Sequence, residues 1–87
     1  MDIFTISDLR EHAAELIRDA EMGELSVVTK HGRPVFIAVP FDENVLKSGV
    51  SVSLAVKFYE KGVLNLGKAA RFAGCSVLEF TEHLARA

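Results

Sequence analysis

Two strand-like runs separated by a short turn constrain this chain more than any other feature of its sequence. The runs Leu25–Lys30 and Val35–Val39 flank the turn residues His31-Gly32-Arg33-Pro34. Because glycine readily adopts the positive φ that a tight hairpin turn requires, the pattern predicts a β-hairpin. Pro40 ends the second strand, since proline has no backbone N–H for a strand ladder.

A β-prone run and an amphipathic helix precede the hairpin. The run is Ile3–Ile6, and Ser7 follows it as the expected N-cap of the helix. One apolar face then recurs at helical spacing over about four turns, until Gly23; it contains Leu9, Ala13, Leu16, Ile17 and Ala20. The order predicts a β-α-β-β unit, with a three-stranded antiparallel sheet covered by one helix. About 40 residues cannot bury both faces of such a sheet, so we expect a second copy to cover the other face in a homodimer.

The second half reads as helical. Asp42 and Gly49 are expected to begin and end a helical turn in a connector. Three helices should follow. The first covers Val52–Lys61, the second begins after an Asn65 cap, and the third begins after a capping box of Ser76 and Glu79. The spacing of Ala70, Gly74, Val77 and Phe80 is typical of a helix-turn-helix, with Val77, Phe80 and Leu84 facing inward. The predicted fold class is therefore α+β. Residues 1–41 form the β-α-β-β unit, 42–50 the connector, and 51–87 a three-helix, helix-turn-helix-like unit.

Charge and cysteine content limit the class of protein. The net charge is −2, and neither half is strongly basic, with −3 over residues 1–40 and +1 over 41–87. The single Cys75 excludes an internal disulfide. No apolar run approaches the roughly 20 residues of a membrane span, and the start does not resemble a signal peptide. We expect a cytoplasmic protein with no membrane partner.

Catalytic chemistry has little support in the sequence. His12, His31 and His83 lie far apart without neighbours at metal-ligand spacing, and Cys75 has no apparent orienting group beyond a distant His83. No glycine-rich phosphate loop is present. We expect no catalytic residue, no metal and no cofactor, and thus not an enzyme.

Nucleic-acid binding rests on a few cations. The helix after Ser76 presents Glu79 and Glu82 where a recognition helix would face phosphates, so a protein-contact or structural role is favoured there over base recognition. In the second half, the sequence is equally compatible with contacts to the DNA backbone and with an ordinary solvated face for four cations: Lys57, Lys61, Lys68 and Arg71. In the first half, Arg10, Lys30, His31 and Arg33 could gather at one edge, but spacing alone favours an ordinary solvated surface.

A family resemblance favours DNA binding, rather than a merely solvated surface, for the cations of the first half. The runs FTISDLREH (residues 4–12) and VVTKHGRPV (residues 27–35) resemble the Phd/YefM antitoxin family, whose pattern covers about residues 2–42. The resemblance implies dimerisation and operator DNA binding through this unit, with repression of the protein's own operon. It implies DNA contacts from Ser7, Arg10, Lys30, His31 and Arg33. Lys30 stands where arginine is common, which keeps the charge but loses bidentate geometry.

The second half departs from that family, whose members carry a C-terminal extension that wraps a cognate toxin, often a ribonuclease. The runs LAVKFYEKG (residues 54–62) and LGKAA (residues 66–70) are instead similar to small uncharacterised helical prokaryotic proteins that are also encoded beside toxins. The chain thus resembles a fusion of two antitoxin-type pieces. The expected toxin-binding residues are Phe58, Tyr59, Phe72 and Leu78; Phe72 and Leu78 fit the inward stripes poorly.

Three hypotheses follow for the function. The first is a type II antitoxin that neutralises a toxin by direct binding and represses its own operon. The second is a stand-alone DNA-binding transcription regulator without a toxin. The third is an adaptor with no nucleic-acid role. A neighbouring gene for a small basic nuclease would separate the first two.

Overall fold

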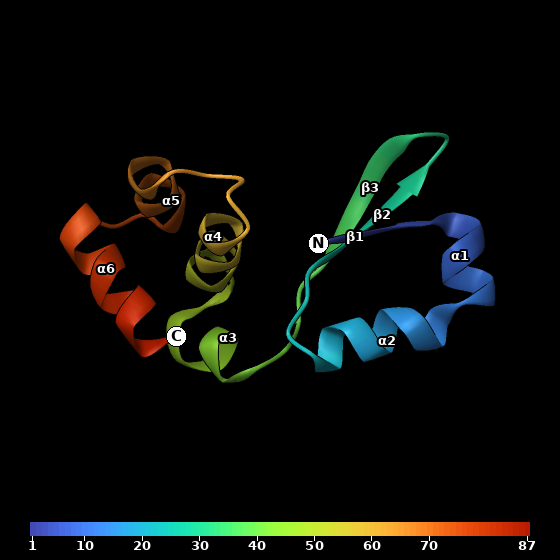
Figure 1. Ribbon diagram of the computed structural model, residues 1–87, viewed down its shortest axis with the longest axis horizontal. Helices are drawn as coiled ribbons and strands as arrows, with labels where there is room; N and C mark the ends of the chain where they lie inside the picture. The colour runs from blue at the N-terminus through green and yellow to red at the C-terminus, as the bar shows by residue number, and fades with distance from the viewer. The chain divides into compact units, whose positions relative to one another are not determined.

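The computed structural model describes residues 1–87, which divide into two compact units, Met1–Phe41 and Asp42–Ala87 (Figure 1). The first unit contains β1 (Asp2–Thr5), α1 (Ile6–Glu11), α2 (Ala13–Glu21), β2 (Ser26–Lys30) and β3 (Arg33–Ala38). The second contains α3 (Glu43–Ser48), α4 (Val50–Glu60), α5 (Leu66–Ala73) and α6 (Val77–Arg86). None of these helices has the length and apolar character needed to span a bilayer.

The sheet is mixed, and the prediction of a wholly antiparallel sheet is wrong. The strand order is β1-β2-β3, with β2 and β3 antiparallel as expected for a hairpin. In contrast, β1 pairs with β2 in parallel, from Asp2 opposite Ser26 to Thr5 opposite Thr29. Parallel neighbours need a crossover of about a dozen residues or more, and α1 and α2 provide one.

The segment between β1 and β2 differs from the single predicted helix. Thr5, rather than Ser7, is the N-cap of α1: its hydroxyl accepts the Asp8 N–H at 3.0 Å, and the Asp8 carboxylate accepts the Thr5 N–H at 3.0 Å. This reciprocal pair is a capping box. His12, with φ −127°, interrupts the helix and separates α1 from α2. Ser7 consequently lies in the first turn of α1, exposed to solvent.

The predicted hairpin is confirmed, but its turn is shorter than the expected four residues, because Arg33 and Pro34 belong to β3. Lys30 lies opposite Arg33, so His31 and Gly32 alone form the loop. Both have positive φ, 53° and 75°, as a type I′ turn requires. Further along, Val28 lies opposite Phe36 and Thr29 opposite Pro34, so β3 has a bulge at this point.

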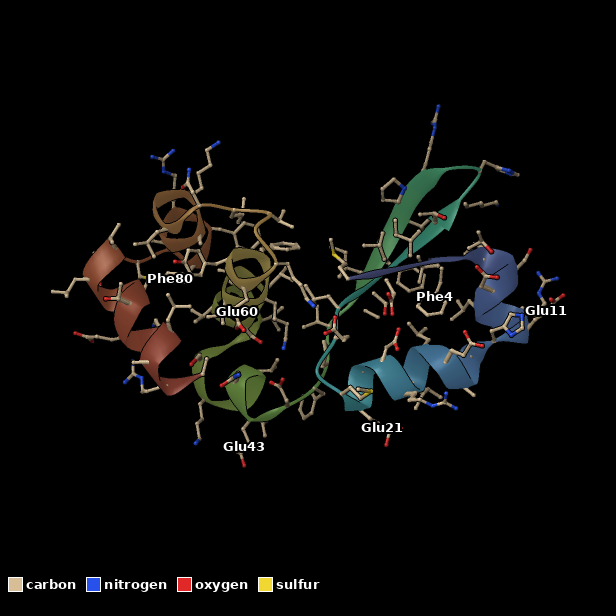
Figure 2. All side chains as sticks on the ribbon, viewed as in Figure 1. Phe4, Glu11, Glu21, Glu43, Glu60 and Phe80 are labelled. Carbon is tan, nitrogen blue, oxygen red and sulfur yellow. The ribbon has the colours of Figure 1, made fainter.

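The two faces of the sheet have different surroundings. Phe4 and Val28 are neighbours on one rung and are buried on the face that α1 and α2 cover; Phe4 lies between strand and helix (Figure 2). Side chains of adjacent rungs point to opposite faces. The rung of Ile3, Val27 and Ile37 therefore faces away from the helices, and Ile3 and Ile37 are 71% and 41% exposed.

In the second unit α3, α5 and α6 begin where the local sequence indicates, whereas α4 begins at Val50, before the predicted Val52. Asp42 caps α3, Asn65 caps α5, and Ser76 with Glu79 forms the predicted capping box of α6. Gly74 ends α5 with a left-handed φ of 75°. These termini confirm the predictions made from capping residues.

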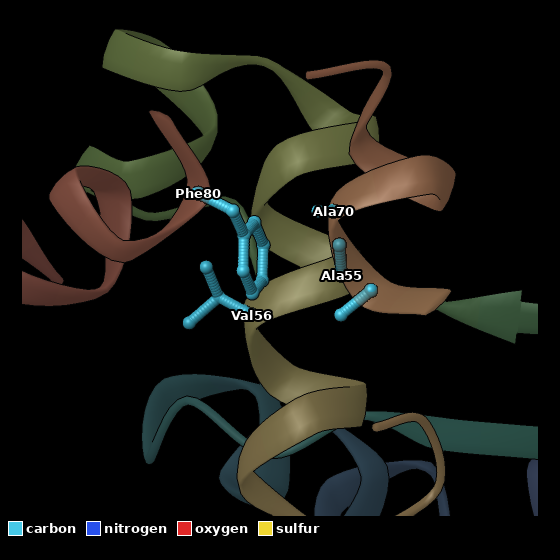
Figure 3. Packing of buried hydrophobic residues seen from close by; sticks show 5 residues of the cluster. Ala55, Val56, Ala70 and Phe80 are labelled. Carbon is cyan, nitrogen blue, oxygen red and sulfur yellow. The ribbon is translucent and has the colours of Figure 1, made fainter. Parts of the chain in front are cut away.

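The core of the second unit is formed by small and aromatic side chains. It consists of Ala55, Val56, Ala69, Ala70 and Phe80, with Phe80 packed beside Val56 (Figure 3). The small alanines of α4 and α5 let these helices approach closely. Val77, predicted to face inward, is 46% exposed, so Phe80 and Leu84 carry the inward face of α6. A helix-turn-helix role for α5 and α6 stays a prediction.

Candidate nucleic-acid and protein interfaces

Three of the predicted DNA-contacting residues line one hollow in the first unit. The hollow has a volume of about 240 Å³ and is bounded by Thr5, Ile6, Ser7, Thr29, Lys30 and His31. Ser7 comes from the start of α1, whereas Lys30 and His31 come from the end of β2 and the hairpin turn. The fold therefore joins two segments that are more than twenty positions apart in the sequence.

The parallel pairing of β1 and β2 is the cause of this arrangement. Thr5, the last residue of β1, lies opposite Thr29, next to the turn. The Thr29 hydroxyl also donates to the Phe4 carbonyl oxygen at 3.4 Å. An antiparallel β1 would have placed the start of α1 at the other end of β2. Sequence reasoning did not include Thr5 and Thr29 in the site because only the register reveals their position.

The other two predicted residues flank the hollow without lining it. Arg33 lies opposite Lys30 across the turn. Arg10 is in the last turn of α1, three residues after Ser7 and so next to it on the helix surface. The side chains of Arg10, Lys30 and Arg33 form no ion pair. The cations of this end are thus not neutralised by carboxylates of the same chain.

A second hollow in this unit is acidic. Its volume is about 560 Å³, and it is lined by Asp2, Ile3, Phe4, Asp8, His12, Glu15, Arg18 and Asp19. A side-chain hydrogen bond with Asp2 raises the pKa of Asp19, and repulsion from neighbouring carboxylates adds to the effect. The capping hydrogen bonds from Thr5 lower the pKa of Asp8. Arg18 is the only lysine or arginine that lines this hollow. It is therefore surrounded by carboxylates and is separate from the cations near the hairpin turn.

Of the four predicted toxin-binding residues, Phe58 and Phe72 contact each other, Tyr59 contacts a core residue, and Leu78 has no aromatic contact. Phe58 of α4 and Phe72 of α5 make an edge-to-face contact, with ring centroids 5.9 Å apart. Tyr59 packs edge-on against the buried Phe80 at 6.1 Å. Leu78 on α6 is 71% exposed, and Phe72 is 48% exposed. Phe58 and Tyr59 therefore help to hold the unit together, while Phe72 and Leu78 present apolar surface to solvent.

The surroundings of the one thiol, Cys75, favour its protonated form. Burial raises the pKa of Cys75, and the nearby Glu79 carboxylate raises it further. A protonated thiol is a poor nucleophile. In addition, the chain has no group of three or more histidine, cysteine or carboxylate side chains positioned to hold a metal ion.

Comparison with known proteins finds two families, whose matches overlap across the boundary between the two structural units. Residues 1–45 match the Phd/YefM antitoxin family of type II toxin–antitoxin systems, and residues 34–87 match UPF0175, an uncharacterised protein family. The chain belongs to the Phd/YefM antitoxin family, with a UPF0175 second half. The matched Phd/YefM family consists of antitoxins of type II toxin–antitoxin systems.

One curated relative of this Phd/YefM–UPF0175 chain has the family name of the second match. A UPF0175 protein of Aeropyrum pernix is 42% identical over 53 residues, which cover 61% of this chain and 57% of the relative. The match thus spans little more than half of that relative's length. No solved structure matches the chain. The two family matches overlap over residues 34–45, which include most of β3.

Proposed function

We propose that this protein is an antitoxin that binds operator DNA as a homodimer through the hairpin end of its first unit and binds its toxin through the second unit. DNA binding would repress the operon that encodes the pair, and the toxin is expected to be a ribonuclease. The proposal rests on family membership together with the geometry of the hairpin end.

The observation that carries the DNA contact is the convergence of Ser7, Lys30 and His31 on one hollow. A hydroxyl, an ammonium group and an imidazole can each donate a hydrogen bond to phosphate oxygens. Arg10 and Arg33 flank these donors and form no ion pair, so binding to phosphate would break no existing salt bridge. These five residues are the proposed DNA contacts.

The exposed sheet face supports the homodimer. Ile3, Val27 and Ile37 form an apolar rung on the face opposite the helices, and Val35 on the same strand as Ile37 is 56% exposed. Two copies packed through these faces would bury this surface and duplicate the hairpin end, as a palindromic operator requires. Ile37→Glu should then yield a monomer in analytical ultracentrifugation. A monomeric wild-type protein at micromolar concentration would disprove the dimer.

We assign the toxin contact to two exposed apolar side chains of the second unit, Phe72 and Leu78. Phe58 supports Phe72, and Tyr59 follows Phe58 directly in α4. Large apolar groups exposed in this way are typical of a protein-contact surface. If the purified protein binds its upstream DNA but no toxin is captured in its native host, a stand-alone regulator would be the better description.

Salt-dependent binding to the protein's own upstream region tests the DNA contact. We expect Arg10→Ala with Arg33→Ala to weaken binding. The slope of log K against log salt should also fall by about one unit for each phosphate that the double variant no longer neutralises. Arg18→Ala is the matched control, because Arg18 lies in the acidic hollow. Equal slopes for the wild type and the double variant would refute the assignment.

A further inference from the structure

A third hollow, in the second unit, is lined by hydrogen-bond donors. Its volume is about 360 Å³, and its walls are Asn44, Lys47 and Ser48 of α3 with His83 and Arg86 of α6. The end of α6 lies beside α3 in Figure 1, in agreement with this lining. No carboxylate side chain lines the hollow, although the second unit has five acidic residues.

We propose that this hollow binds a phosphate group. Amide, ammonium, hydroxyl, imidazole and guanidinium groups from two helices converge there, and each can donate to a phosphate oxygen. Two of them, Lys47 and Arg86, also supply positive charge, which makes such hydrogen bonds shorter and stronger. Phosphate suits this donor set better than a carboxylate does, because it offers more acceptor oxygens to donors that approach from two sides.

The helix dipole alone does not account for the hollow. Lys47 and Arg86 each lie in the last turn of a helix, where a cation interacts favourably with the dipole. That effect would place basic side chains at each helix end separately. It does not explain why Asn44 and Ser48 line the same hollow as His83.

Both walls of the hollow are held in place by contacts elsewhere in the unit. On α3, Asp42 accepts the Val45 N–H at 3.2 Å and pairs with Lys57 of α4 at 3.5 Å. On α6, the fully buried Phe80 fixes the helix to the core. The two helices that carry the donors are thus held in place before any ligand arrives, so that only the exposed side chains must be ordered on binding.

Two existing contacts involve the lining residues. Arg86 Nη2 lies 3.5 Å from His83 Nδ1; when this nitrogen accepts, the ring proton is on Nε2 and available to a ligand. Lys47 pairs with Glu43 at 3.7 Å, but both side chains are highly exposed, at 76% and 86%. Such a surface pair is weak. Glu43 therefore competes only modestly with a phosphate ligand.

The test is a titration of the full-length protein with inorganic phosphate, monitored by NMR at constant ionic strength. A parallel titration with chloride is the control for nonspecific anion effects. We expect saturable shifts of the Ser48 amide and the His83 ring. Arg86→Gln should weaken binding about tenfold, the factor for removal of one charge-assisted hydrogen bond. Arg71→Gln is the matched control: Arg71 also lies in a last helical turn, but outside the hollow.

Two further arms identify the source of the phosphate and check the role of Glu43. Glu43→Gln should tighten binding by removing the competing carboxylate. A DNA duplex that causes the same shifts, in competition with inorganic phosphate, would identify the nucleic-acid backbone as the source; shifts with inorganic phosphate alone would identify a free phosphate. Equal responses to phosphate and chloride, or equal affinities of the Arg86→Gln and Arg71→Gln proteins, would overturn the proposal. This outcome is independent of the hairpin residues proposed to contact DNA.

Discussion

Thr5 at the end of β1 lies opposite Thr29 of β2 in a parallel ladder, and this pairing places the start of α1 beside the hairpin turn. Residues on both sides of the pair line a common hollow, with Ser7 on one side and Lys30 and His31 on the other. The proposed DNA surface depends on strand direction as much as on residue identity.

The hairpin turn should be sensitive to substitution at Gly32. Its φ is 75°, and an added Cβ would meet no atom within 4 Å, so the cost of Gly32→Ala is conformational and not steric. We expect a decrease of about 1 kcal/mol in the free energy of unfolding, measured with urea. Gly67→Ala is the control with the opposite expectation: in α5, where the nearest contact is ordinary at 3.7 Å, alanine should stabilise by about 0.5–1 kcal/mol. A stabilised Gly32→Ala protein would show that the turn has another conformation.

Local signals in the sequence predict most of the secondary structure. The caps at Asn65 and Ser76 and the left-handed Gly74 depend on hydrogen bonds and φ preferences within a few residues, so the sequence alone specifies them. The hairpin is similarly local, since Gly32 and its flanking strands determine it.

Such local signals do not predict whether β1 runs parallel or antiparallel to β2. Its alternation of exposed Ile3 and buried Phe4 is the same whether the strand runs parallel or antiparallel to β2. The length of the helical connection through α1 and α2 favours a parallel β1, and the prediction of an antiparallel sheet did not take that length into account. The phosphate hollow was missed for a related reason: its walls, near Lys47 and Arg86, approach each other only in the tertiary structure.

Stability should respond to pH through Asp19. The hydrogen bond with Asp2 raises the pKa of Asp19, so ionisation of this group costs more in the folded state than in the unfolded chain. The wild type should lose stability as pH rises from the ordinary aspartate pKa through the raised one. Asp19→Asn removes this effect, so the variant should be more stable than the wild type at pH 7 and similar in acid. Thermal unfolding across this range measures the difference.

Glu79 provides a comparison of opposite sign. Hydrogen bonds from Ser76 lower the pKa of Glu79, so its contribution is present above the unfolded pKa and is lost as pH falls through the folded pKa. Glu79→Gln should therefore reduce stability at pH 7 and not in strong acid. If both variants gained stability relative to the wild type as pH rises, the assignment for Glu79 would be wrong; if both lost stability, the assignment for Asp19 would be wrong.

Ser53 carries a buried hydroxyl without a hydrogen-bond partner. The residue is 2% exposed within α4. Because an unpartnered buried polar group is costly, Ser53→Ala should stabilise the second unit by about 1 kcal/mol or more in urea unfolding. Ser51→Ala, on the exposed side of the same helix, should gain only about 0.5 kcal/mol from helix propensity. A less stable Ser53→Ala protein would mean that the hydroxyl makes a stabilising contact.

Leu78→Ala should separate toxin binding from folding. Since Leu78 is 71% exposed, we expect little change in stability but weaker capture of the toxin by at least tenfold, as for truncation of a buried interface anchor. Phe72→Ala should weaken capture as well and also remove the edge-to-face packing on Phe58. Phe80→Ala, in the core, should instead destabilise by about 3–5 kcal/mol. Unchanged toxin affinity in a folded Leu78→Ala and Phe72→Ala protein would exclude this surface.

Amide chemical-shift mapping with a duplex of the upstream region tests the central claim most directly, because it reports on the start of α1 and the hairpin turn at once. We predict that Ser7, Arg10 and the turn from Lys30 to Arg33 shift together, with a common affinity, while Arg18 and its neighbours in the acidic hollow change little. Shifts confined to α5 and α6, or no response at the hairpin turn, would contradict it.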